Sequence, residues 1–180
     1  MKVWDYESKD KPIHDSLSVQ LDKDPNIVMT QPDMAKYLLS LINFEPNDIL
    51  MEPGLGTGSF YNNFPEYTIN KFCEINLGID YLNQNEIVDY TISNPPFVPR
   101  KLFWEFHMKA MQTTRKEIYW LINMASLNVF TPNRIATMNK IGWYIQDFHI
   151  VSDKRWYGRY VFVRISKNKN KLFTYSKINF

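Results

Sequence analysis

The chain has 180 residues, of which 44% are hydrophobic, so it is expected to form one globular domain rather than a disordered chain. No apolar run reaches the length of a membrane span, and the charged first ten residues are not typical of a signal peptide. We therefore predict a cytoplasmic protein without a membrane partner. The formal net charge is only +2, yet residues 150–180 carry eight Lys or Arg and one Asp. This distribution indicates contact with a polyanion, although a basic segment that keeps the chain soluble gives the same pattern.

The alternation of strands and helices begins after a polar stretch. Residues 1–26 contain Pro12 and Pro25, which predicts an N-terminal arm before a single domain over residues 27–180. A helix is expected to begin near Thr30, since Pro32 suits a first helical turn. The pattern then predicts helices at 34–42, 59–64, 101–114 and 133–141, and strands at 48–52, 69–75, 88–93, 117–122, 144–152 and 159–166.

This order is typical of a three-layer α/β sandwich with a mostly parallel sheet. Residues 144–152 and 159–166 alternate between apolar and polar side chains, as the two strands of a hairpin do. The last strand is therefore expected to be antiparallel to its neighbours.

A glycine-rich loop follows the first predicted strand. Gly54, Gly56 and Gly58 stand at alternate positions after Pro53, so the backbone can approach a ligand closely. The spacing differs from that of the P-loop and of the dinucleotide fingerprint. Glu52, directly before the loop, would repel a pyrophosphate but would favour a cation such as a sulfonium or an ammonium group.

Two acidic residues follow the second predicted strand. Glu74 stands where α/β nucleotide-binding proteins place an acid for ribose hydroxyls, and Asp80 comes six positions later. Both could be solvated loop residues, but the glycine loop upstream favours ligand contact. The single cysteine, Cys73, is expected to be a small buried side chain, and the three scattered histidines lack ligand spacing, so we predict no metal site.

The turn Asn94-Pro95-Pro96-Phe97 ends the third predicted strand. Its prolines lack a donor N–H and stop the strand, at the end of the sheet where open α/β folds place their chemistry. The Asn94 amide and the Pro95 carbonyl provide two acceptors beside the Phe97 ring. This combination suits a planar amine, such as the exocyclic amine of a base, although Phe97 could instead anchor the turn in the core.

Together, these motifs resemble the S-adenosylmethionine-dependent amino-methyltransferases, most closely the adenine-N6 DNA enzymes with the gamma order of motifs. The resemblance covers roughly residues 29–97 and rests on the Thr30-Gln31-Pro32 segment, the loop from Glu52 to Gly58, Glu74, Asp80 and the Asn94–Phe97 turn. It implies the Rossmann-like class I methyltransferase sandwich, S-adenosylmethionine as cofactor, and DNA, or else RNA, as partner. Because so few residues separate Glu74 from Asp80, the sheet is expected to be trimmed beside the second strand.

The resemblance also implies roles for these residues. Thr30 and Gln31 would contact the methionine part of the cofactor, with the glycines beneath it. Glu74 would hold the ribose and Asp80 the adenine amine. Asn94 and Pro95 would accept the hydrogens of the target amine, and Phe97 would stack on its base.

Cations near the expected catalytic turn and in the C-terminal hairpin are candidates for contact with nucleic acid. Arg100 and Lys101 follow the turn, and the hairpin interleaves cations with rings at Arg155, Trp156, Tyr157 and Arg159. The aromatic hairpin could instead be packed inside the protein.

Three alternative functions share part of this evidence. Methylation of RNA adenine or of a protein glutamine would use the same chemistry, because each substrate offers a planar amine. A non-catalytic subunit would keep the fold and support a protein partner, which could also supply target recognition.

Overall fold

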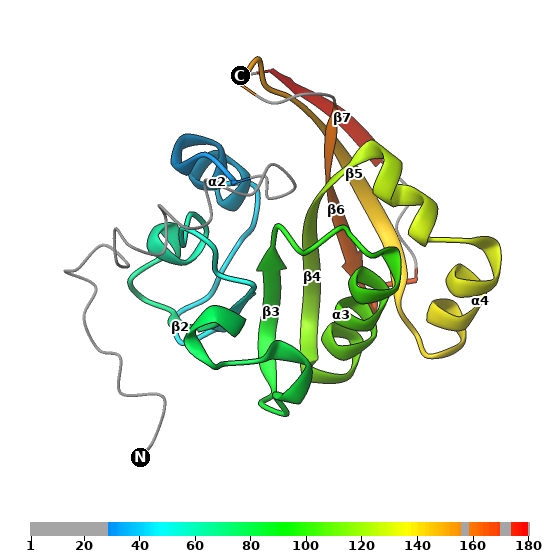
Figure 1. Cartoon of the computed structure of the whole chain (residues 1–180), viewed down its shortest axis with the longest axis horizontal. Coiled ribbons are helices and arrows are strands. Elements are labelled where there is room, and N and C mark those ends of the chain that lie inside the picture. Colours follow the sequence, from blue (N-terminus) through cyan, green and yellow to red (C-terminus); the bar gives the residue numbers. More distant parts are fainter. Residues whose placement is uncertain (1–28, 156–158, 170–173, 180) are drawn as a thin grey trace.

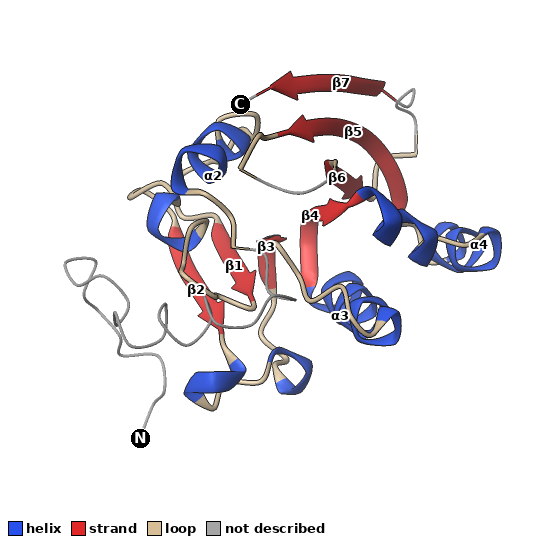
Figure 2. Cartoon of the chain, turned by 45° about the horizontal axis from the view of Figure 1, so that its top comes forward, coloured by secondary structure: helices blue, strands red, loops and turns tan. Residues whose placement is uncertain are grey.

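The computed structural model describes residues 29–155, 159–169 and 174–179, which form a sheet with helices on both faces (Figures 1 and 2). The sheet has seven strands in the order β2-β1-β3-β4-β6-β5-β7. In chain order, the strands are β1 Ile49–Pro53, β2 Ile69–Cys73, β3 Val88–Ser93, β4 Thr114–Asn123, β5 Tyr144–Ser152, β6 Tyr160–Ser166 and β7 Thr174–Asn179.

The described residues also form three α-helices and four short 3₁₀ helices, of which α2 precedes β1 and the others lie between strands. The α-helices are α2 Pro32–Leu39, α3 Arg100–Thr113 and α4 Pro132–Lys140, and the 3₁₀ helices are η1 Tyr61–Asn63, η2 Ile75–Leu77, η3 Tyr81–Asn83 and η4 Met124–Val129. No helix in this part of the chain is long and apolar enough to span a membrane.

The strand pairing confirms the predicted α/β fold with a mostly parallel sheet. β1 pairs in parallel with β2 and β3, and β3 pairs in parallel with β4. β6 is antiparallel to both β4 and β5, which confirms the predicted hairpin.

The prediction that the last strand would be antiparallel to its neighbours is wrong. The chain continues into β7, which pairs in parallel with the outer edge of β5. An edge strand is held by backbone hydrogen bonds to one neighbour and needs no continuous apolar pattern. The polar residues Ser176, Lys177 and Asn179 therefore hid this strand within the basic C-terminal segment.

The alternating side chains of β4 show how the three layers are joined. Tyr119 and Leu121 pack on the α2 side of the sheet, whereas Ile118, Trp120 and Ile122 pack with residues of α3 and α4 on the other side. A strand that is buried on both faces reads as a continuous apolar run, which is why the sequence marks it clearly.

The sheet is trimmed beside β2, as the sequence predicted. β2 is an edge strand, and within the described residues the chain passes from it through η2 and η3 to β3 without another strand. β1, β2 and β3 are parallel, so the segments that follow Pro53, Cys73 and Ser93 begin at the same edge. A hydrogen bond from Ser93 Oγ to the Pro53 carbonyl joins two of these strand ends directly.

Candidate functional site

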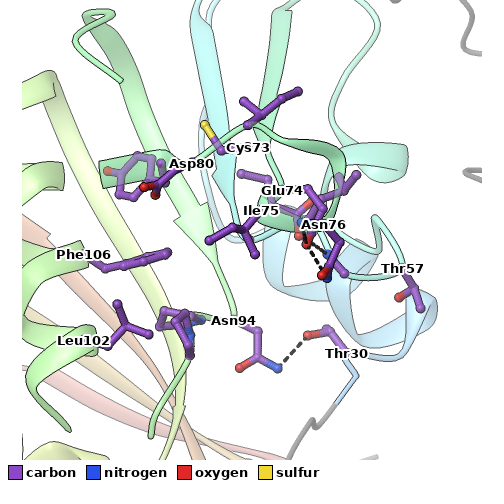
Figure 3. Close-up of a pocket in the computed structure, with 18 of the residues that line it drawn as sticks. Thr30, Thr57, Cys73, Glu74, Ile75, Asn76, Asp80, Asn94, Leu102 and Phe106 are labelled. Carbon is purple, nitrogen blue, oxygen red and sulfur yellow. Dashed lines mark hydrogen bonds between the residues drawn. The ribbon is translucent and has the colours of Figure 1, made fainter. Parts of the chain in front are cut away.

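A cavity of about 440 Å³ lies at this edge of the sheet (Figure 3). Its walls come from the glycine loop, the segment after β2, the turn after β3 and the first turns of α3. In Figure 3, Thr30 and Asn94 lie at one end of the group, while Asp80 and Cys73 lie at the other. Of the residues predicted to form the site, the cavity is lined by Thr30, Glu52, Gly54, Gly56, Glu74, Asp80, Asn94, Pro95, Pro96 and Phe97.

The predicted residues Gln31, Pro53 and Gly58 do not line the cavity but support it. Gln31 is the N-cap residue of α2, and its carbonyl accepts from Ala35 N at 2.9 Å. Pro53 ends β1, and Gly58 N donates to the Leu55 carbonyl at 2.7 Å, which closes the loop.

The glycine loop has a backbone conformation that side chains disfavour. Gly54, Gly56 and Gly58 have φ angles of 74°, 53° and 74°, in the left-handed region. The N–H groups of Gly54 and Leu55 both donate to the Cys73 carbonyl, at 2.9 and 3.0 Å, so the loop is attached to the end of β2. The loop is therefore held in place by the protein itself.

Glu52 is buried beneath the loop, with only 3% of its surface exposed. Its carboxylate accepts from Tyr61 N at 2.7 Å and so fixes the beginning of η1. Burial raises the pKa of Glu52 well above its ordinary value, and the charge of Glu74 raises it further, against the backbone hydrogen bonds that lower it. A buried acid of this kind favours a cation in the adjoining space.

Glu74 connects the segment after β2 to the glycine loop. One carboxylate oxygen accepts from Gly56 N at 3.0 Å, and the other accepts from Asn76 N and Nδ2 at 3.1 and 2.8 Å. Asp80 has a similar local role, because its oxygens accept from Leu82 N and Asn83 Nδ2. Both acids face the cavity from short, hydrogen-bonded turns.

The Asn94–Phe97 turn forms the opposite end of the cavity. The Asn94 Nδ2 atom donates to Thr30 Oγ1 at 3.2 Å, and Figure 3 shows the amide oxygen turned away from Thr30. Pro95 is buried, and Phe97 is partly buried with its ring centroid 6.3 Å from that of Tyr160. Phe97 thus anchors the turn and also forms part of the wall.

The side chains proposed to contact nucleic acid differ in whether they already pair with an acidic side chain of this protein. Arg100 and Arg159 are exposed, and Lys101 Nζ lies 3.5 Å from the Glu105 carboxylate. The Arg155 guanidinium instead donates hydrogen bonds to the carboxylates of Asp153 and Asp33. These hydrogen bonds lower the pKa of both acids. Trp156 and Tyr157 lie outside the described residues.

Several cavity residues were not singled out by sequence reasoning. Leu102 and Phe106 of α3 form an i, i+4 stripe that resembles any core-facing helix, yet both reach the cavity. Exposed Ile75, directly after Glu74, adds a third apolar wall. The hydroxyl of Ser59 donates to the Thr30 carbonyl at 2.6 Å, a contact that no local sequence signal indicates. In the described part of the chain, no cluster of side chains has the composition of a metal site.

No protein-family model matches the sequence, and no curated protein matches it. Solved structures do match the fold. A candidate RNA methyltransferase from Pyrococcus horikoshii has a TM-score of 0.57 and 18% identity, covering 87% of this chain and 97% of that one. A candidate class I S-adenosylmethionine-dependent methyltransferase from Listeria monocytogenes has a TM-score of 0.65 and 13% identity, covering 89% and 70%.

A third structure is the modification subunit of a candidate type I restriction enzyme from Vibrio vulnificus. Its TM-score is 0.61 at 11% identity, and the match covers 87% of this chain and 48% of that one. At these identities the likeness concerns the fold alone. The chain therefore has the Rossmann-like fold of class I methyltransferases.

Proposed function

We propose that this protein is a methyltransferase that transfers the methyl group of S-adenosylmethionine to the exocyclic N6 amine of adenine in DNA. The observation that carries the proposal is the meeting of two motifs in one cavity. The glycine loop with Glu52 and Glu74 forms one wall, and the Asn94–Phe97 turn forms another. Small-molecule sites commonly have a volume like this one, about 440 Å³.

The cavity residues fit the chemical parts of this cofactor. Ile75, Leu102 and Phe106 provide apolar walls for a flat adenine ring. The carboxylates of Glu74 and Asp80 are acceptors for ribose hydroxyls and for an amine. Buried Glu52 favours the positive charge of a sulfonium or an ammonium group, since an opposite charge nearby stabilises the ionised carboxylate.

Asn94 and Pro95 would activate the target amine. The lone pair of an adenine amine is delocalised into the ring, so the amine is a poor nucleophile. Hydrogen bonds from its two hydrogens to Asn94 Oδ1 and the Pro95 carbonyl would favour a tetrahedral nitrogen with a localised lone pair. This is catalysis by positioning and preorganised dipoles, without a covalent enzyme intermediate.

The reaction then needs no further protein group. S-adenosylmethionine supplies a methyl group bonded to positively charged sulfur. With its hydrogens held by Asn94 and Pro95, the amine lone pair would form the new nitrogen–carbon bond, while the electrons of the sulfur–carbon bond would remain on sulfur and the surplus proton would pass from nitrogen to water. Phe97, at the cavity wall, would stack on the base while it is held outside its helix.

A nucleic acid is the favoured substrate because exposed Arg100 follows the catalytic turn and exposed Arg159 precedes β6. Two of the structural neighbours are described as an RNA methyltransferase and as a modification subunit of a restriction enzyme. DNA is placed first because the order of motifs resembles that of the DNA adenine enzymes. RNA adenine, a protein glutamine and a non-catalytic role beside a protein partner are the alternatives.

The experiment is methyl transfer from labelled S-adenosylmethionine to unmethylated DNA, total RNA and a protein extract, measured side by side. Asn94→Ala serves as the control for chemistry in this cavity. The proposal expects label in DNA as N6-methyladenine, and none with the variant. Label in RNA or protein would show that RNA or protein, and not DNA, is the substrate. Cofactor binding without transfer to any of the three would favour the non-catalytic role.

A further inference from the structure

Thr30 connects the glycine loop to the catalytic turn through hydrogen bonds. It is buried, with 7% of its surface exposed, and it precedes Gln31, the N-cap residue of α2. Its Oγ1 atom accepts from Asn94 Nδ2 at 3.2 Å, and its carbonyl accepts from Ser59 Oγ at 2.6 Å. Ser59 Oγ lies 3.1 Å from Thr57 Oγ1 in the glycine loop. A continuous set of contacts therefore joins Thr57 to Asn94.

The orientation of the Asn94 amide decides whether it can accept a hydrogen from an amine. The last torsion of an asparagine side chain is broad and roughly two-fold, so the amide can present either its NH₂ group or its oxygen. Only the oxygen accepts. With the NH₂ group toward Thr30, the oxygen is turned toward the opposite side, as Figure 3 shows.

We propose that Thr30 is a positioning residue whose hydroxyl holds the Asn94 amide with its oxygen toward the methyl acceptor. The inference rests on the proposed function of the Asn94–Phe97 turn. It differs from the cofactor contact that the resemblance implies for Thr30, because the hydroxyl here acts on a catalytic side chain.

The hydroxyl can both donate and accept, so the direction of its own hydrogen matters. When that hydrogen is donated to another acceptor, the oxygen of Thr30 is available to the Asn94 NH₂ group. A carboxylate bound near the Thr30 end of the cavity would provide such an acceptor. The methionine part of S-adenosylmethionine carries one, so its binding would strengthen the productive orientation of Asn94.

The size of the effect follows from the strength of one hydrogen bond. An ordinary hydrogen bond corresponds to a preference of about 3- to 10-fold for one amide orientation. Thr30→Val, which keeps the shape and removes the hydroxyl, should therefore slow single-turnover methyl transfer by at most about 3- to 10-fold, which is the full preference that the bond supplies. Thr30→Ser keeps the hydroxyl and should restore the rate. Thr137→Val removes an exposed hydroxyl on α4 that donates a hydrogen bond to the Asn133 carbonyl of the same helix. This variant should leave the rate unchanged.

A second readout is independent of methyl transfer. The side-chain ¹⁵N–H₂ resonances of Asn94 can be assigned by their loss in Asn94→Asp. They should shift in Thr30→Val but stay close to wild type in Thr30→Ser and Thr137→Val. Adding S-adenosylhomocysteine should move them further in wild type than adding 5′-methylthioadenosine, which lacks the carboxylate.

The outcomes separate this inference from the proposed function. Unchanged Asn94 resonances in Thr30→Val, or equal loss of rate in Thr30→Val and Thr30→Ser, would overturn the role of Thr30. If Thr30→Val does not fold, Thr30→Ala is compared with Thr30→Ser by the same two readouts. Wild-type protein that transfers no methyl group would contradict the proposed function, while the resonances would still test the Thr30–Asn94 contact.

Discussion

The two sides of the cavity are built in different ways. On the side of the glycine loop, here called the cofactor side, Glu52 and Glu74 are nearly fully buried, and each accepts a backbone N–H from another segment. On the side of the Asn94–Phe97 turn, here called the acceptor side, the chain opens to solvent directly after the turn, with 77% of Val98 exposed. The difference fits the proposed function, in which a small cofactor is held by preformed contacts and a large substrate approaches from outside.

The largest effect on the cofactor side is expected from Glu74→Ala. The change removes a carboxylate that bonds Gly56 N and that is proposed to hold the ribose. Hydrogen bonds to a charged group contribute about 1.5–3 kcal/mol, so S-adenosylmethionine should bind about 10- to 100-fold more weakly. Titration calorimetry measures this, with exposed Glu66→Ala as the control. An affinity for S-adenosylmethionine equal to that of wild type would show that Glu74 does not contribute to cofactor binding.

Glu52 should make the stability of the ligand-free protein depend on pH. Burial raises its pKa, so the folded chain keeps a proton that the unfolded chain has already lost. The contribution of Glu52 to stability is therefore greatest below the ordinary glutamate pKa and is lost as the pH rises through the raised value, by at most about 1.4 kcal/mol per pH unit. Urea unfolding across this pH range measures the slope.

Glu52→Gln provides the matched variant for this slope, since the amide oxygen can still accept from Tyr61 N without titrating. The variant should show a flatter dependence on pH. Saturating S-adenosylmethionine should also flatten the wild-type slope, because a nearby cation favours the ionised carboxylate. Equal slopes in wild type and variant would show that Glu52 does not carry the effect.

Gly56→Ala should separate backbone strain from ligand binding. Gly56 has a φ angle of 53°, and an added Cβ would meet Met29 Sδ at 3.3 Å. Gly142, at the end of α4, has a φ angle of 83° with nothing near an added Cβ. Both Ala variants should lower the unfolding free energy by about 1–2 kcal/mol, but only Gly56→Ala should weaken cofactor binding. Calorimetry and urea unfolding together test this, and similar affinity in both variants would contradict it.

The smallest effects are expected from the exposed cations of the acceptor side. Replacing Arg100 and Arg159 together by Ala should lower the salt dependence of DNA binding by about 0.9 in log–log slope for each phosphate that the protein no longer neutralises. Cofactor affinity should not change. Lys140→Ala, which replaces an exposed residue of α4, is the control. Arg155 is left out because its guanidinium already bonds Asp33 and Asp153. A slope equal to wild type would place the nucleic acid elsewhere.

The sequence predicted those parts of the structure whose signals are local. Buried strands read as apolar runs, and alternate glycines mark a loop, so the fold and cavity residues such as Glu52, Glu74 and Asn94 could be located. β7 was missed because an edge strand needs little apolar surface. Leu102 and Phe106 were predicted only as part of a helix at 101–114, since spacing cannot distinguish a cavity wall from a core face.

Long-range polar contacts could not be predicted in the same way. Thr30 and Asn94 are 64 residues apart, and their hydrogen bond exists only once α2 and β3 are placed. Arg155 was assigned to nucleic acid from its neighbours in sequence, whereas its bond to Asp33 joins residues 122 positions apart. The sequence supplies the residue types, but the packing of distant elements decides what each side chain contacts.

The most direct test of the two-sided cavity is Asn94→Ala, with cofactor affinity and single-turnover methyl transfer measured on the same preparation. Loss of one preorganised polar group should slow transfer by about 100- to 1000-fold. The affinity for S-adenosylmethionine should stay within about three-fold of wild type, because the cofactor side is intact. A parallel loss of affinity, or transfer at the wild-type rate, would contradict the account.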